Sequence, residues 1–145
     1  MTKHTLVDLE RRAIDLRNSG HIEEAAELFS AVVKEQPDWE HGIGFYDLAG
    51  CYEELGKFEL AEECYHAALR YQPASTTFLG GLASFLYLHG EPAKAFNSYL
   101  ELLEVDRMNK DAKGIELSTT ALKALGKTMG LTEAAVTEKI NRIPL

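Results

Sequence analysis

The 145-residue sequence has only four prolines, two cysteines and no unbroken apolar run of membrane-spanning length. So few prolines allow long helices almost everywhere along the chain. Cys51 and Cys64 are too few, and too far from any histidine pair, to frame a zinc site, so we expect half-buried reduced thiols. The lack of an apolar segment after Met1 predicts a cytoplasmic protein that is neither exported nor embedded in a membrane.

Basic residues are scarce, and the formal net charge of −8 argues against nucleic acid as a partner. The charge is uneven along the chain. Residues 1–106 hold eight Lys/Arg against nineteen Asp/Glu, whereas residues 107–145 hold seven against four. The basic end is either an interaction surface or simply the solvated face of a helical end piece.

The residue patterns of common catalytic and metal sites are also missing. Gly80-Gly81 lies in a helix-period segment without a following Lys-Ser/Thr, and none of the five histidines forms a His-x-x-x-His pair. No nucleophile elbow occurs. Adjacent acidic pairs such as Glu62-Glu63 diverge by about 100° on a helix, so they do not converge on a substrate. We therefore predict a non-enzymatic protein with no cofactor and no metal.

What the sequence does contain is an internal repeat, marked by Gly20, Gly56 and Gly90, which are spaced 36 and 34 residues apart. Each glycine follows an apolar-periodic segment and precedes another. We expect it to end the first helix in the left-handed conformation. Each unit is thus predicted to be a hairpin of two helices.

These units resemble the tetratricopeptide repeat, whose pattern asks for a large residue, Leu, a small residue and an aromatic, then Ala, an aromatic, Ala and Pro. The middle unit matches through Phe45, Leu48, Ala49, Tyr52, Gly56, Ala61, Tyr65, Ala68 and Pro73. The first matches through Leu9, Ala13, Leu16, Gly20, Ala25, Phe29 and Pro37, and the third through Leu79, Leu82, Ala83, Leu86, Gly90, Ala95 and Tyr99. Four positions depart from the pattern. Arg12 stands where Leu is usual, Val32 and Leu102 stand where Ala is usual, and Arg107 stands where Pro is usual.

The resemblance implies an all-α fold, a right-handed α-solenoid of antiparallel helix hairpins. We expect one domain over residues 1–145, with repeats at about 6–39, 42–75 and 76–109. Residues 110–126, with apolar Ile115, Leu117, Leu122 and Leu125, and residues 132–143 are expected to form two further capping helices. Trp39, in a lengthened junction between the first two units, is expected to pack across it; a partner contact is the alternative.

In the family, the first helices of successive units line a concave groove that binds a peptide. By position, the resemblance places Val7, Glu10, Ile14, Arg17, Ile43, Tyr46, Gly50, Glu53, Thr77, Gly80, Ser84 and Tyr87 in this groove, with Asp111, Gly114 and Ser118 as an extension. The small residues Gly50, Gly80, Gly81 and Ser84 either keep room for a guest or allow tight helix stacking. Tyr46 and Tyr87 are expected to wall the space.

Family members that grip a C-terminal carboxylate use a ring of Lys, Asn and Arg in this groove. The matching positions here are Glu10, Ile14, Asp47, Thr77 and Gly81, none of which is cationic. An apolar or mildly basic partner segment fits better. We therefore predict a protein-binding module: an adaptor, a secretion-type chaperone or an immunity or inhibitor protein. The alternative is a structural subunit that assembles through its convex face or its ends, or self-associates.

Overall fold

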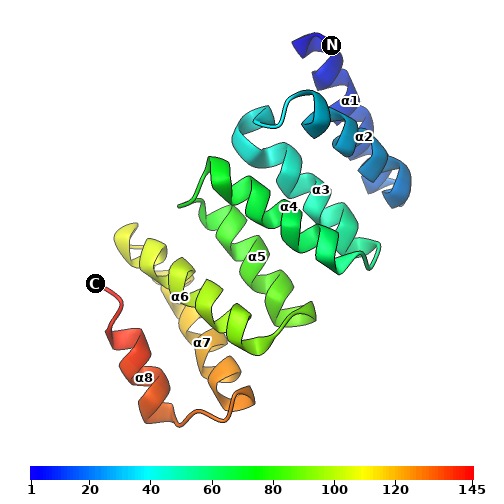
Figure 1. The fold of residues 1–145 in the computed structure, drawn as a ribbon. Helices are drawn as coiled ribbons and strands as arrows, with labels where there is room; N and C mark the ends of the chain where they lie inside the picture. The colour runs from blue at the N-terminus through cyan, green and yellow to red at the C-terminus, as the bar shows by residue number, and fades with distance from the viewer. The chain divides into compact units, whose positions relative to one another are not determined.

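The computed structural model describes all 145 residues and contains eight α-helices, one short 3₁₀ helix and no strand (Figure 1). The elements are α1 (Lys3–Asn18), α2 (Ile22–Glu35), η1 (Trp39–Gly42), α3 (Ile43–Glu54), α4 (Phe58–Tyr71), α5 (Thr76–His89), α6 (Pro92–Met108), α7 (Ala112–Thr128) and α8 (Glu133–Asn141). The predicted all-α fold of helix hairpins is confirmed. The chain divides into two compact units, Met1–Pro73 and Ala74–Leu145.

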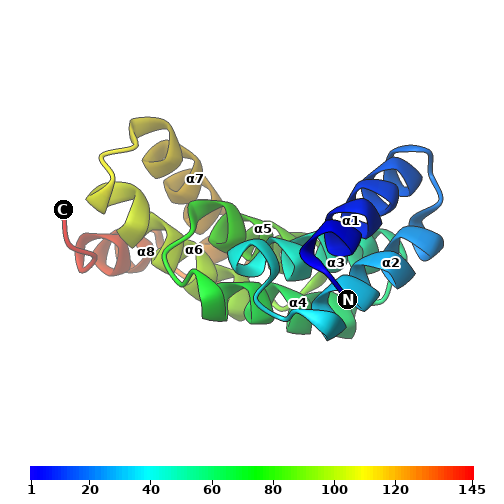
Figure 2. The same cartoon turned by 90° about the horizontal axis from the view of Figure 1, so that it is seen from above.

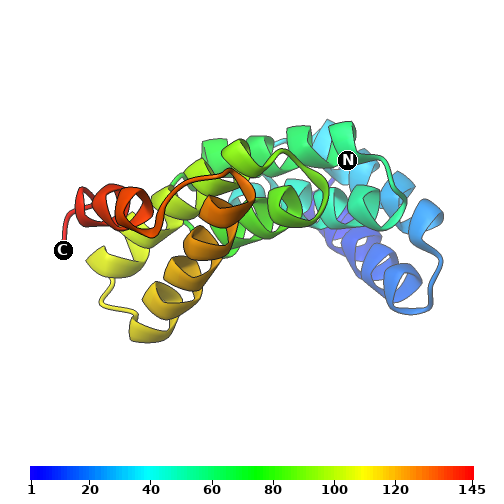
Figure 3. The same ribbon diagram turned by 90° about the horizontal axis from the view of Figure 1, so that it is seen from below.

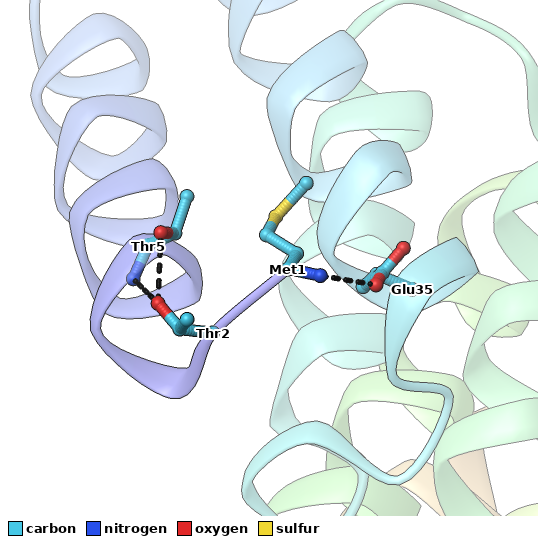
Figure 4. Close-up of polar contacts among 4 residues, drawn as sticks. All are labelled: Met1, Thr2, Thr5 and Glu35. Carbon is cyan, nitrogen blue, oxygen red and sulfur yellow. Dashed lines mark hydrogen bonds and ion pairs between the residues drawn. The ribbon is translucent and has the colours of Figure 1, made fainter.

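In the first unit α2 packs against both α1 and α3, and α3 packs against α4 (Figure 2). The start of α1 is held by two polar contacts (Figure 4). The Thr5 amide donates to the Thr2 hydroxyl at 3.2 Å, and the Met1 ammonium lies 2.9 Å from a Glu35 carboxylate oxygen on α2. A Thr N-cap satisfies one of the amides that the helix itself leaves unpaired.

The glycine prediction is correct for two of the three hairpin turns. Gly20 and Gly56 have φ values of 85° and 74°, the left-handed conformation that ends α1 and α3. At Gly90 the prediction is wrong, because its φ of −105° is extended. Pro92 opens α6 and drives Glu91 before it into an extended conformation, so the chain enters α6 by a different turn.

Trp39 lies in the junction between α2 and α3 and is only 2% exposed. It packs against Leu6 of α1 and Val32 of α2, and its indole N–H donates to a Glu10 carboxylate oxygen at 2.8 Å. On the α3 side it lies beside Gly44, where an added methyl group would come within 3.5 Å of the Trp39 side chain. Trp39 therefore packs across the junction, as predicted, and is not a partner contact.

In the second unit α6 packs against both α5 and α7, and α8 packs against α7 (Figure 3). A buried polar contact links α6 and α7, because the Ser118 hydroxyl donates to the Asp106 carboxylate at 3.1 Å. The Arg107 guanidinium donates to the backbone oxygens of Ile140 and Ile143 at 3.0 and 2.6 Å, which fastens the end of the chain to α6. Both cysteines are buried free thiols.

None of these helices combines the length and the apolar character that crossing a bilayer requires.

Replacing Trp39 tests whether the first unit depends on this junction. We expect Trp39→Ala to lower the free energy of unfolding by ~3–5 kcal/mol, since a large buried ring leaves a cavity. Trp39→Phe keeps most of the apolar volume but loses the bond to Glu10, so its loss should be about 1–2 kcal/mol. Urea denaturation followed by far-UV circular dichroism gives both values. A Trp39→Ala midpoint equal to that of the native sequence contradicts this role.

Candidate functional site

The predicted site residues fall in both units, and each set is described within its own unit. The first unit holds Val7, Glu10, Ile14 and Arg17 on α1 and Ile43, Tyr46, Gly50 and Glu53 on α3. The second holds Thr77, Gly80, Ser84 and Tyr87 on α5.

In the first unit the space left at Gly50 is filled by Arg17. A methyl group added to Gly50 would lie 2.5 Å from Arg17 Nη2 and 3.1 Å from Cζ. The guanidinium lies over Gly50 of α3 and extends to Glu54 at the end of the same helix. There its Nε and Nη2 donate to the Glu54 carboxylate at 3.0 and 2.7 Å. The space left by the absence of a side chain at Gly50 is therefore occupied by the Arg17 side chain of the same protein and is not open to a partner.

Most other predicted residues of α1 and α3 also contact neighbours within the unit. Glu10 accepts the bond from Trp39, and Glu53 accepts one from the Tyr65 hydroxyl at 2.8 Å. The Tyr46 ring packs edge-on against the Tyr65 ring, with 5.9 Å between centroids. Ile14, by contrast, is 42% exposed and is the apolar side chain of the set that faces water.

Asp47, which the resemblance assigns to one of the carboxylate-gripping positions of the groove, lies among these groups. Burial raises its pKa to about 6, the Arg17 guanidinium opposes this shift, and the Glu10 carboxylate adds to it. A neighbouring thiol, Cys51, has a pKa raised to about 11 by burial and is therefore protonated at neutral pH. The α1–α3 face thus combines one guanidinium with several carboxylates.

In the second unit, residues of α5, α6 and α7 line a hollow of about 290 Å³. We call it the α5–α7 hollow; it is lined by Ser84, Tyr87, Leu88, Tyr99, Leu117, Thr120, Ala121 and Ala124. No lining residue carries a charge. Tyr87, Leu88 and Leu117 are 44%, 65% and 61% exposed. The Tyr87 ring meets the Tyr99 ring edge-on, with 6.3 Å between centroids.

Of the predicted residues on α5, Ser84 and Tyr87 line the hollow, while Thr77 is exposed and Gly80 has no atom within 4 Å of an added methyl group. Sequence reasoning did not predict Leu117 as a site residue and named it, with Leu122, only as an apolar residue of the expected capping helix. Five helical residues turn through about 500°, so these two side chains point in clearly different directions. This difference in direction could have indicated from the sequence that Leu117 does not share the buried face of Leu122.

The predicted extension along α7 is wrong for two of its three residues. Ser118 is 1% exposed and bonded to Asp106, and a methyl group on Gly114 would lie 2.7 Å from the Asp106 carboxylate. Both residues face α6. Asp111 instead caps α7, accepting a bond from the Gly114 amide at 3.1 Å.

Comparison with known proteins finds a family model that matches part of the chain. Residues 46–110 match the sequence profile of the tetratricopeptide repeat. Over these residues the chain resembles the tetratricopeptide repeat in sequence, as the repeat pattern predicted. No curated protein sequence matches it significantly.

Solved structures with the same fold include repeat proteins of type III secretion. The Yersinia enterocolitica secretion chaperone SycD, in complex with a peptide of the translocator YopD, is 22% identical over 88% of this chain and 97% of that chain, with a TM-score of 0.75. A type III secretion complex from Aeromonas hydrophila is 21% identical, covering 90% and 87%, with a TM-score of 0.73. MamA of strain AMB-1 is 19% identical, covering 93% and 70%, with a TM-score of 0.71. These similarities establish the fold.

Replacing Gly50 and Gly80 by alanine tests whether the space beside each glycine is filled or open. We expect Gly80→Ala to stabilise the protein by about 0.5–1 kcal/mol, because alanine favours a helix and nothing lies near the added methyl group. Gly50→Ala must displace the Arg17 guanidinium and weaken its pairing with Glu54, so it should give no gain or a net loss. Urea denaturation of both variants measures the difference, and equal gains contradict the Arg17 assignment.

The raised pKa of Asp47 predicts how stability depends on pH. Its ordinary value is 3.8, so between pH 4 and 6 the native state holds a proton that the unfolded chain has released. Stability therefore falls as the pH rises through this range. At pH 7 Asp47→Asn should be more stable than the native sequence by ~1–2 kcal/mol, and the difference should vanish near pH 4.

Urea denaturation across this pH range measures the effect, with Asp15→Asn, an exposed carboxylate of α1, as the matched control. A pH profile of Asp47→Asn that is identical to the native profile argues against a buried, protonated Asp47.

Proposed function

We propose that this chain is a non-enzymatic protein-interaction module that holds an apolar segment of a partner protein in the α5–α7 hollow. The observation that carries the proposal is the combination of exposed apolar side chains with an uncharged, concave lining. Contiguous exposed apolar surface is unfavourable in water and marks interaction sites.

The lining suits a peptide better than a small substrate. A volume of about 290 Å³ is at the lower limit of pockets for small ligands and suits the insertion of one or two side chains. The hydroxyls of Ser84, Tyr87 and Thr120 are available to hydrogen-bond the backbone of a bound segment. Tyrosine supplies rigid contact area at low entropic cost.

No reaction chemistry belongs to this proposal, since the lining offers hydroxyls but no histidine, carboxylate or lysine to activate one. Nor does any residue of α8 line the hollow, so the chain does not fill it with its own last helix.

The α1–α3 face is proposed to favour basic over acidic partner residues. It presents Glu10, Asp47, Glu53 and Glu54 against the single guanidinium of Arg17. Ile14 of α1 offers an exposed apolar side chain, and Ile43 and Tyr46 of α3 are half-buried. The partner segment is accordingly apolar or mildly basic.

The fold similarity to SycD, which has been crystallised with a peptide of YopD, supports a secretion-type chaperone over an adaptor or an immunity protein within this class. The proposal itself rests on the hollow and not on that similarity.

Panning a phage-displayed peptide library against the protein tests the proposal. We expect uncharged, apolar peptides to be enriched. Their affinity, measured by calorimetry, should fall about tenfold in Tyr87→Ala and in Leu117→Ser, because each removes apolar contact area in the hollow. Tyr46→Ala tests the contribution of the first unit in the same way.

Leu60→Ser is the matched control, because Leu60 is an exposed leucine of α4 outside the hollow, and its affinity should be unchanged. Enriched peptides that bind equally to the native sequence, Tyr87→Ala and Leu117→Ser would refute binding in the hollow.

A further inference from the structure

We propose a second docking surface, at the junction of α7 and α8, for an acidic segment of a partner protein that carries one apolar side chain. It is independent of the α5–α7 hollow, with which it shares no lining residue.

The junction contains a pocket of about 190 Å³ with an apolar floor. Leu131, in the loop between the helices, and Val136 of α8 form the floor. Val136 packs directly onto α7 at Gly126, where an added methyl group would collide with its Cγ2 atom. This contact fixes one side of the pocket while leaving room for an aliphatic side chain beside it.

Two lysines are among the lining residues of this pocket. Lys123 and Lys127 are one helical turn apart on α7, and both are exposed. Neither forms an ion pair. Like charges at this spacing repel each other, so an anion placed between them relieves an unfavourable interaction. The remaining polar lining is Thr137 and a single carboxylate, Glu133.

The distribution of charge along the sequence agrees with this assignment. Residues 107–145 hold seven basic side chains against four acidic ones, whereas residues 1–106 hold eight against nineteen. An acidic segment is therefore repelled by most of the chain and attracted to this end of it. The α7–α8 pocket is thus proposed to favour acidic partner residues, whereas the α1–α3 face is proposed to favour basic ones.

Nuclear magnetic resonance of the ¹⁵N-labelled protein tests the proposal with the capped peptide Glu-Glu-Leu-Glu-Glu. We expect saturable shifts of the Leu131, Val136 and Thr137 amides. The charge reversal Lys123→Glu/Lys127→Glu should weaken binding about tenfold or more. Replacing the peptide leucine by glycine should weaken it severalfold, because the apolar floor then has no occupant.

Two controls define the outcome. Lys113→Glu reverses an exposed lysine of α7 that lines neither site, and should change the affinity less than about twofold. The peptide Lys-Lys-Leu-Lys-Lys should leave the three amides unshifted. The proposal is overturned if no saturable shift appears, if the doubly reversed variant binds equally well, or if the acidic peptide shifts the α5–α7 hollow instead. None of these results bears on the apolar peptides selected for that hollow.

Discussion

Close approach of the two helices in each hairpin is the constraint on which this structure depends. Matching alanines meet that constraint: Ala13, Ala49 and Ala83 in the first helices, and Ala25, Ala61 and Ala95 in the second, are all fully buried. A methyl group lets the backbones approach while leaving no void, and a larger side chain there would have to force the helices apart. Larger side chains such as Phe29, Phe78 and Leu103 then fill the remaining interior.

Hairpins built on the same plan present chemically different surfaces. On the α1–α3 face, Arg17 spans the gap to Glu54, and carboxylates surround it. On the α5–α7 face, α5 carries no Asp, Glu, Lys or Arg, and the gap stays open. A long charged side chain can fill a space because its stem packs while its head finds a partner. The α5–α7 hollow has no such charged side chain in its lining, and it stays open.

The distribution of charge divides these surfaces further. Under our proposals the acidic α1–α3 face, the uncharged hollow and the basic α7–α8 pocket favour different partner segments, which would let the chain discriminate by repulsion as well as by contact.

The sequence by itself determined the repeat, the buried alanines, the left-handed turns at Gly20 and Gly56, and the uncharged character of α5, because these depend on helical period and local backbone preference. Only the tertiary structure decided that Arg17, thirty-three residues earlier in the chain, fills the space at Gly50, and that Ser118 turns inward to Asp106 while Leu117 faces water. The physical reason is range: a helix pattern is set by neighbours three or four residues away, whereas the filling of a gap depends on side chains that only packing brings together.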